Sequence, residues 1–322
     1  MSFRFPARRP RLAIRAPFAA LAAALAVVAC GGSTSQYEPF VAERVLAFGD
    51  DASALTSDGR NYAVNGLKTG TTTIDCAAQP NWVQVLAGFY GLVLAECNTA
   101  TPPATPRAFT RAAPGARVAE VVAQIDTQVA AGGFRNKDLA LFFVGMNDVL
   151  ELYRQYPTLS EAELIAEAGR RGERAAAQVN RLVDLGAKVV VANLPDMGLS
   201  PYARAEAAAN AASGFDRAAL ITRLTNAFNE RLGVRMRNDG RFVGLAQLDL
   251  RTQQARVSPA RVGLSDIATA SCTVPLPDCT TGTIATGITA ATALWADGTR
   301  LGTGGQSALA ELVLQRAQNN PF

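Results

Sequence analysis

The stretch Leu139-Ala140-Leu141-Phe142-Phe143-Val144, which is followed by Gly145-Met146-Asn147-Asp148, decides the fold class. An uninterrupted apolar run of this length predicts a strand that is buried on both faces. The runs Val45-Leu46-Ala47-Phe48 and Val189-Val190-Val191 have the same character. Segments with helical periodicity separate the three runs, so the sequence predicts an α/β domain with a parallel sheet covered on both faces.

The remaining elements are expected between and after these strands. Helices are expected over residues 81–92, 118–131, 160–185, 215–236 and 303–317. Ser160 with Glu163 forms a capping-box signature, and Gly186 is typical of a helix end. A further strand is expected over residues 242–250, a surface loop over 99–106, and a loop or hairpin over 268–293. We therefore expect one domain with two excursions, over residues 58–110 and 251–293.

Residues 1–29 are typical of an export signal. Arginines between positions 4 and 15 precede an apolar run, residues 16–29, that is too short to span a bilayer permanently. The run ends in Val27-Val28-Ala29-Cys30, which resembles the bacterial lipobox. That resemblance implies that Cys30 is lipidated, and the following Gly31 favours the outer membrane. A plain signal peptide with an incidental cysteine is the alternative.

This interpretation divides the chain into a signal peptide (1–29), a lipidated tether (30–43) and a domain (44–322). It predicts an exported outer-membrane lipoprotein of a Gram-negative bacterium, on the periplasmic or the cell-surface face. The membrane would then be one partner, through the lipid anchor.

Composition excludes several classes of site. The 322 residues include no His, which excludes the usual Ser-His-Asp triad, a Cys-His pair and His-ligated metals. The formal net charge is +4, but residues 1–29 contain five Arg and no acid, so the rest of the chain carries 4 − 5 = −1. Charge therefore offers no argument for nucleic-acid binding.

Four cysteines follow Cys30, namely Cys76, Cys97, Cys272 and Cys279. An even number in an exported chain predicts disulfides. Three pairings are possible, and the short loops favour Cys76–Cys97 and Cys272–Cys279. A metal site is a poor alternative because the chain has neither His nor a CxxC motif. No metal and no cofactor are expected.

Polar clusters follow the predicted strands. They span residues 48–51, 144–148 and 193–196, and a fourth cluster, 295–300, precedes the last helix. Ligands of doubly wound sheets bind beyond the carboxyl ends of the strands, where these clusters are expected to meet.

The order of these clusters resembles that of the GDSL, or SGNH, hydrolases, a family of esterases and lipases. Five blocks carry the resemblance: Phe48-Gly49-Asp50 with Ser53 (family FGDSLSD), Pro114-Gly115-Ala116 (GGA), Gly145-x-Asn147-Asp148 (GxND), Leu194-Pro195-Asp196-Met197-Gly198 (NLPDLG) and Ala296-Asp297-Gly298 (DGxHPT). The resemblance implies a three-layer α/β/α flavodoxin-like fold with a central parallel sheet. It also implies a carboxylic-ester hydrolase ancestry.

The chain departs from the family pattern at two positions. The nucleophilic Ser is expected at position 51 and the catalytic His at position 300, where this chain has Asp51 and Arg300. The triad Asp is retained as Asp297. Asn147 and Gly115 match the oxyanion donors.

Two neighbouring residues are expected to act as supports. Ser53 matches the family's second Ser and is expected to support the first turn. Asp148 is expected to brace its own loop. Arg remains protonated near neutral pH and cannot act as the missing base.

Three functional hypotheses follow. The first is a surface lipoprotein, catalytically impaired, that binds an acyl ester, lipid or glycan in the former cleft, with Arg300 held in an ion pair by Asp51 and Asp297. The alternative is an active hydrolase of esters or glycosides that uses Asp50, Asp51 and Asp297 as a carboxylate site or as ligands of a hard cation. The third is a structural or interaction protein whose cleft no longer matters, and a cleft filled by Arg300 and Leu301 would favour it. Trp82 and Trp295 are expected in the core or the cleft wall.

Overall fold

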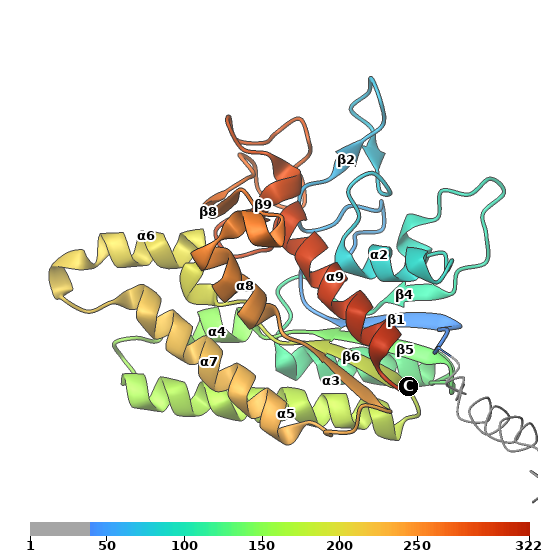
Figure 1. Cartoon of the computed structure of the whole chain (residues 1–322), viewed down its shortest axis with the longest axis horizontal. Coiled ribbons are helices and arrows are strands. Elements are labelled where there is room, and N and C mark those ends of the chain that lie inside the picture. The colour runs from blue at the N-terminus through green and yellow to red at the C-terminus, as the bar shows by residue number, and fades with distance from the viewer. Residues whose placement is uncertain (1–38) are drawn as a thin grey trace, which may run out of the picture. The chain divides into compact units, whose positions relative to one another are not determined.

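A five-stranded parallel sheet lies at the centre of the computed structural model, which describes residues 39–322 (Figure 1). In sheet order its strands are β4 (Ala108–Thr110), β1 (Arg44–Gly49), β5 (Asp138–Phe143), β6 (Lys188–Ala192) and β7 (Val243–Ala246). All neighbouring pairs are parallel. Numbered along the chain, this order is 2-1-3-4-5, that of flavodoxin-like doubly wound folds. The predicted fold class is confirmed.

The predicted apolar runs form the three central strands. All six residues of β5 are buried, and Val45 to Gly49 of β1 and Val189 to Ala192 of β6 are buried too. Strands of this kind need no polar face because helices cover both sides of the sheet. The sheet is therefore the core of the domain.

Helices form a layer on each face. On one face α2 (Trp82–Phe89) and α9 (Thr303–Asn319) pack together, with α8 (Leu248–Val257) beside α9. On the other face α3 (Val118–Ala130) and α5 (Glu161–Asp184) contact the sheet, and α4 (Met146–Tyr153) and α7 (Arg217–Arg235) pack against α5.

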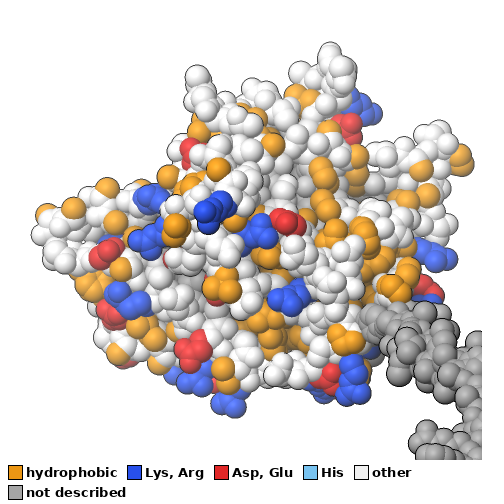
Figure 2. Space-filling view, in the orientation of Figure 1, with side chains coloured by type: hydrophobic (Ala, Val, Ile, Leu, Met, Phe, Trp, Pro, Cys, Tyr) orange, Lys and Arg blue, Asp and Glu red, His pale blue; other side chains and the backbone are white. Residues whose placement is uncertain are grey.

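Along the lower edge of Figure 2, Lys and Arg side chains alternate with acidic ones.

The longest helix shows how local sequence sets these layers. Ser160 caps α5, its Oγ accepting from Glu163 N at 3.3 Å while Glu163 Oε2 accepts from Ser160 N at 2.8 Å. Gly186, with φ of 98°, follows the helix. A Cβ at Gly172 would lie 2.2 Å from Phe228 O, so this glycine permits the close crossing of α5 and α7. The predicted helix and both of its ends are confirmed.

One expectation for the second half of the chain was wrong, and another was met in part. The strand expected over residues 242–250 ends at Ala246, and α8 begins at Leu248. Asn193 Oδ1 accepts from Asp249 N at 3.1 Å and so satisfies an amide of the first helical turn. The segment 268–293 is mostly a loop, as one of the two alternatives predicts, and it is not a hairpin, because β8 (Asp266–Ala270) pairs in parallel with β9 (Ala293–Trp295). The helices α4 and α6 (Pro201–Ala209) and the strand β4 were not anticipated.

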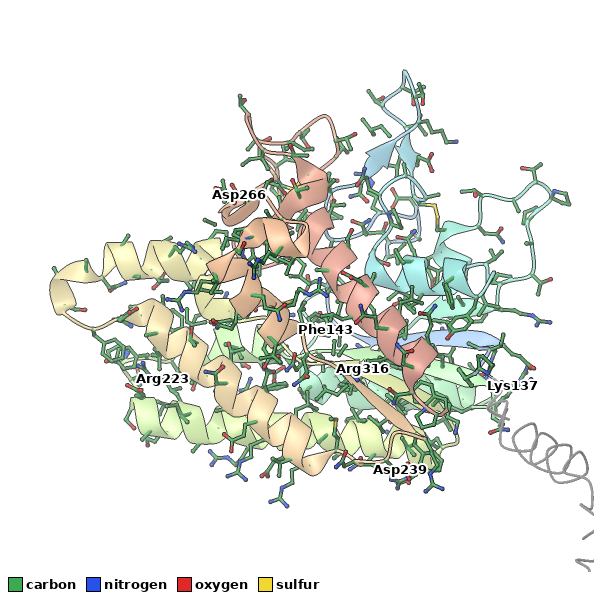
Figure 3. All side chains as sticks on the ribbon, viewed as in Figure 1. Lys137, Phe143, Arg223, Asp239, Asp266 and Arg316 are labelled. Carbon is green, nitrogen blue, oxygen red and sulfur yellow. A yellow bond between two sulfur atoms is a disulfide. The ribbon has the colours of Figure 1, made fainter. Side chains whose placement is uncertain are left out.

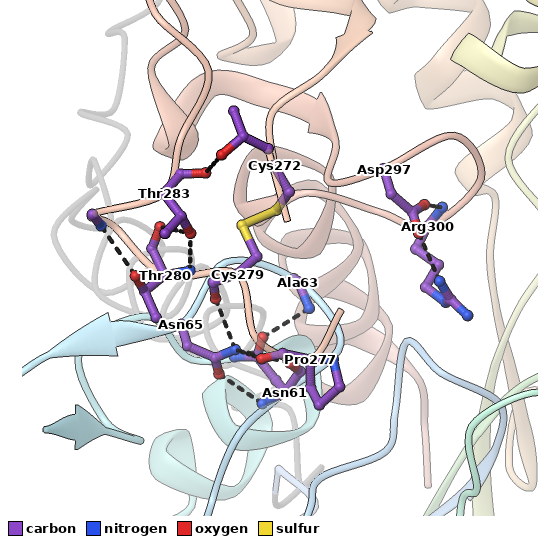
Figure 4. The surroundings of a disulfide bond; sticks show 12 residues. Asn61, Ala63, Asn65, Cys272, Pro277, Cys279, Thr280, Thr283, Asp297 and Arg300 are labelled. Atoms are coloured by element: carbon purple, nitrogen blue, oxygen red, sulfur yellow. Dashed lines mark hydrogen bonds and ion pairs between the residues drawn. A yellow bond between two sulfur atoms is a disulfide. The ribbon is translucent and has the colours of Figure 1, made fainter. Parts of the chain in front are cut away.

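Both favoured disulfides, Cys76–Cys97 and Cys272–Cys279, are present. The first joins the segment after the hairpin of β2 (Gly66–Leu67) and β3 (Ile74–Asp75) to the chain before β4. The second closes a loop that Asn65 holds, since Asn65 Nδ2 donates to Pro277 O at 2.8 Å and to Cys279 O at 3.1 Å (Figure 4). The two excursions therefore pack against each other.

Residues 39–322 form one compact unit that contains the sheet, the two helical layers described above and both disulfides. Within this part of the chain no helix is both long and apolar enough to cross a membrane. The predicted signal peptide, Cys30 and the tether up to residue 38 lie outside the described residues.

Candidate functional site

The turn after β1 forms the first wall of the site. Gly49 has φ of 139°, and a Cβ there would lie 1.8 Å from Phe143 O, so glycine is required. Gln124 of α3 binds both polar groups of this glycine, accepting from Gly49 N and donating to Gly49 O at 2.8 Å each. The turn is therefore fixed, and it places Asp51 at the carboxyl end of β1.

The start of α4, directly after β5, forms the second wall. Gly145 has φ of 129°, and a Cβ there would lie 2.5 Å from the ring of Phe228. Two residues later, Asn147 Nδ2 donates to Ala116 O and to Asp51 Oδ2, both at 3.0 Å. The first and third blocks of the motif thus meet between β1 and β5. This is the switch point of the sheet, where ligands of such folds bind.

The Asp51 carboxylate is the centre of the site. Its Oδ2 accepts from Gly115 N at 2.9 Å and from Asn147 Nδ2 at 3.0 Å. Its Oδ1 accepts from Arg300 Nε at 2.8 Å. The residue is only 2% exposed. One carboxylate therefore engages both predicted oxyanion donors and the guanidinium at once.

Arg300 bridges two carboxylates. Its Nη1 donates to Asp297 Oδ2 at 2.6 Å, while Asp297 Oδ1 accepts from the backbone N of Thr299 and of Arg300 at 2.8 and 2.7 Å. Burial alone would lower the pKa of Arg300, but the charges of Asp51 and Asp297 raise it. The predicted ion pair is present, and its guanidinium remains charged across the physiological range.

The other two acids of these blocks lie behind the site. Asp50 is fully buried, and burial followed by the charge of Asp51 raises its pKa well above the usual range. Asp148 Oδ2 accepts from Val118 N at 2.9 Å, at the start of α3. Burial raises the pKa of Asp148 to about 6. The sequence predicts that Asp148 braces its own loop, but the structure shows its carboxylate holding the start of α3 instead.

The carboxylate-site alternative gains no support from this arrangement. Acid/base work on a glycoside needs accessible carboxyl groups on either side of a substrate. Asp50 is fully buried, and both oxygens of Asp51 are already hydrogen-bonded. Among the described residues there is also no group of three or more Cys, Asp or Glu placed to hold a metal ion.

Several supporting residues lie where the sequence predicts them. Ser53 is buried beneath the first turn, and its Oγ accepts from Trp82 Nε1 at 3.2 Å. Trp82 and Trp295 are fully buried in the core. Asp196 holds its own turn, accepting from Gly198 N at 3.0 Å.

Sequence reasoning missed two residues of the site. Tyr62 belongs to the first excursion, and burial, followed by the charge of Asp51, raises its pKa. No motif marked it. Gln124 is a buried polar residue on the apolar face of α3, and that misfit with the helical pattern was a usable signal. Figure 4 shows the loop of Asn61 and the disulfide-bonded loop near the turn that carries Asp297 and Arg300.

The 2-1-3-4-5 sheet, with its polar cluster at the switch point, defines an SGNH hydrolase fold. The family described as GDSL-like Lipase/Acylhydrolase matches residues 45–311, and the chain belongs to that family.

Solved structures of similar fold include the acetyl xylan esterase AlAXEase, with 12% identity over 84% of this chain and 98% of that chain and a TM-score of 0.44. The acetylxylan esterase Axe2 from Geobacillus stearothermophilus shares 13% identity over 86% of this chain and 95% of its own, with a TM-score of 0.43. A member of the lipolytic protein G-D-S-L family from Veillonella parvula has 8% identity, coverages of 84% and 96%, and a TM-score of 0.42. A search among curated proteins found no match.

Proposed function

We propose that this chain is a surface lipoprotein of the GDSL family that no longer hydrolyses esters and that binds its ligand at the former active site. The observation that carries the proposal is the position of Asp51 Oδ2, which accepts from Gly115 N and Asn147 Nδ2 at 2.9 and 3.0 Å. In a family enzyme these donors would receive the oxyanion of the substrate. Here a carboxylate of the protein itself takes their hydrogen bonds.

The chemistry of the substituted pair supports the loss of hydrolysis. Arg300 is charged and donates to Asp51, so it cannot remove a proton from a nucleophile. If Asp51 attacked an ester, it would form a mixed anhydride, and no positioned base would activate water to cleave it. Loss of triad members typically costs about 10⁴ to 10⁶ in rate.

The proposed ligand is an acyl ester, lipid or glycan that contacts the outer side of Arg300. The guanidinium uses Nε and Nη1 on the two carboxylates, and its side chain is still 34% exposed. No hydrogen bond joins Nη2 to another described residue. A ligand oxygen can accept a hydrogen bond from Arg300 Nη2 without displacing Asp51 from Gly115 N and Asn147 Nδ2. The site can therefore bind a ligand although its oxyanion donors are not free for hydrolysis.

The proposed location follows from the N-terminal sequence, and the two disulfides agree with an oxidising compartment. Cys30→Ser is expected to abolish incorporation of labelled palmitate and to release the protein from the membrane fraction. Retention of the label in that variant would contradict lipidation at Cys30.

Hydrolysis of a short-chain chromogenic ester tests the loss of activity. Wild type is expected to show no turnover beyond that of Asp51→Ala. The double variant Asp51→Ser/Arg300→His is expected to gain at least about 100-fold, because it restores nucleophile and base to the retained donors. The two single variants are matched controls that should gain little. Wild-type turnover that Asp51→Ala abolishes would overturn the proposal.

Ligand binding is tested separately, by calorimetric titration of wild type and Arg300→Gln with short acyl esters and acylated oligosaccharides. A saturable signal that weakens at least about tenfold in the variant is expected, since a charged donor to a ligand oxygen is lost. Equal affinity in both proteins would show that Arg300 does not bind the ligand.

A further inference from the structure

The amino ends of the five sheet strands carry an excess of positive charge. The charged residues within three positions before each strand, or at its first residue, are Glu43, Arg44, Arg107, Arg135, Lys137, Asp138, Lys188 and Arg241. Six of these eight are basic and two are acidic, so this end carries +6 − 2 = +4. The chain after the signal peptide has a net charge near zero, so the excess is local.

Both acids are already paired, and so is Asp239, which lies four positions before β7. Arg44 binds the buried Asp138 at 2.5 Å, Lys137 lies 3.2 Å from Glu43, and Arg241 lies 2.7 Å from Asp239. Arg107, Arg135 and Lys188 have no carboxylate of the described residues within ion-pair distance. We call these three, together with Lys137 and Arg241, the basic end.

The basic end is open to solvent. Arg107, Arg135, Lys137 and Arg241 are exposed. Between the starts of β1, β4 and β5 lies a hollow of about 300 Å³, and Arg107, Arg135 and Lys137 contribute to its lining. Figure 3 labels Lys137 and Asp239 at this end, away from Asp266.

Further cations surround Phe242, between the starts of β6 and β7. Lys188 Nζ lies 4.6 Å from the ring centre of Phe242, and the guanidinium carbons of Arg237 and Arg241 lie 5.9 and 5.7 Å from it. Arg237 is neutralised by Asp184 at 2.7 Å. Lys188 and Arg241 therefore add two cations to the same end of the sheet, and basic side chains of this kind are attracted to anionic lipid surfaces.

The described chain enters the fold at this same end. Phe40 packs against Phe322 with ring centres 5.5 Å apart, and the adjacent Asn320 donates to Val243 O at the start of β7. From Cys30 to Pro39 are nine residues, which reach about 30 Å when fully extended. Lipidation of Cys30 would therefore keep the basic end within about 30 Å of the bilayer surface.

We propose that the basic end docks on the headgroups of anionic phospholipids in the membrane that holds the lipid anchor. This inference rests on the lipoprotein assignment of the proposed function. Unpaired Lys and Arg near an anionic leaflet are attracted within a Debye length, about 10 Å at 0.1 M salt. Docking directs the carboxyl ends of the strands, and hence Asp51 and Arg300, away from the bilayer.

Vesicle binding by residues 39–322 tests the proposal without the lipid anchor or the basic signal peptide. The probe is a vesicle with about 30% phosphatidylglycerol in phosphatidylcholine, compared with pure phosphatidylcholine at about 0.1 M salt. The test variant is Arg107→Glu/Arg135→Glu/Lys137→Glu. The matched control is Lys68→Glu/Arg256→Glu/Arg261→Glu, which makes the same charge change at exposed residues away from the basic end. Thermal unfolding checks that both variants remain folded.

Wild type and the control variant are expected to co-sediment with the anionic vesicles alone, and the test variant to bind at least about tenfold more weakly. Equal loss in both variants, or equal binding to neutral vesicles, would overturn the proposal. So would failure of wild type to bind. None of these results bears on lipidation, because that is decided by palmitate labelling of wild type and Cys30→Ser.

Discussion

The two ends of the sheet differ in how deeply their charged side chains are buried. At the carboxyl ends, Asp50, Asp51, Asp148 and Asp196 are at most 2% exposed. At the amino ends, most of the charged side chains are exposed, and several form simple pairs at the surface. Removing a charge from water is costly unless fixed partners replace the water. The difference teaches that fixed partners hold the charges at the carboxyl ends, whereas substitutions of the exposed charges at the amino ends should cost little folding stability, apart from the buried pair of Arg44 and Asp138.

The largest expected difference in unfolding free energy is between substitutions of two glycines with positive φ, one at each end of the sheet. Gly49→Ala is expected to cost more than about 4 kcal/mol or to prevent folding, because its Cβ would lie 1.8 Å from Phe143 O. Gly133, near the start of β5, has φ of 66°, and a Cβ at this position would meet nothing within 4 Å. Gly133→Ala is therefore expected to cost about 1 kcal/mol. Urea unfolding of both variants checks this, and equal costs would contradict it.

The second prediction concerns pH. The pKa of Asp148 lies at about 6, above its ordinary value of 3.8, so the folded state binds this proton more tightly than the unfolded state. Protonated Asp148 therefore stabilises the folded state. This stabilisation is fully present below about pH 4 and is lost as the pH rises through 6, which lowers the unfolding free energy by about 3 kcal/mol. Asp148→Asn is expected to remove that part of the pH dependence of the unfolding free energy. An unchanged pH profile would contradict the prediction.

Asp239 at the basic end supplies the comparison. Hydrogen bonds from Arg241 lower the pKa of Asp239 to about 2. Its contribution is therefore present above about pH 4 and is lost as pH falls toward 2. Asp239→Asn is expected to change the profile only on that acidic side, with the opposite sign to Asp148.

The third prediction concerns the ion pair. Asp51→Ala leaves Arg300 without its main partner, and Arg300→Ala leaves the Asp51 carboxylate buried with neutral donors only. Each is expected to cost about 2 kcal/mol, less than for a fully buried pair because Arg300 is 34% exposed. The double variant should cost clearly less than the sum. Unchanged melting temperatures would refute the structural role of the pair.

The smallest effect is expected at the basic end. Lys137 and Glu43 form an ion pair at 3.2 Å between side chains that are 58% and 60% exposed. Lys137→Ala and Glu43→Ala are each expected to change the unfolding free energy by less than about 0.5 kcal/mol. If either variant lost as much unfolding free energy as Arg300→Ala, the expected difference in stability effects between the two ends of the sheet would be wrong.

The fold was predictable because its central strands and long helices carry strong periodic patterns. The run 139–144 indicated a doubly covered strand, and Ser160 with Gly186 marked both ends of α5. Residues 242–250 misled because Leu248 is apolar in either a strand or a helix, and the capping partner Asn193 lies far away in sequence. The parallel pairing of β8 with β9 is likewise a long-range contact that no local pattern announces.

The site was predictable to the extent that the family order places its blocks together. The structure brings Asp51, Asn147, Gly115, Arg300 and Asp297 into one network, as the sequence hypothesis requires. The sequence did not reveal that one carboxylate oxygen would accept from both donors, because that depends on the backbone direction which Gly49 and Gly145 impose. Tyr62 was missed for a similar reason, since only tertiary packing brings it to Asp51.

The position of Asp51 also has a consequence for inhibition. Because the Asp51 carboxylate is held in place by the fold, its effective concentration at Gly115 N and Asn147 Nδ2 far exceeds that of a diffusing acid or ester at millimolar level. An external ligand oxygen would therefore have to displace the Asp51 carboxylate to reach these two donors. Reagents that capture active-site serines have no nucleophile to react with at this position, and analogues of the tetrahedral intermediate meet a donor pair that is already filled.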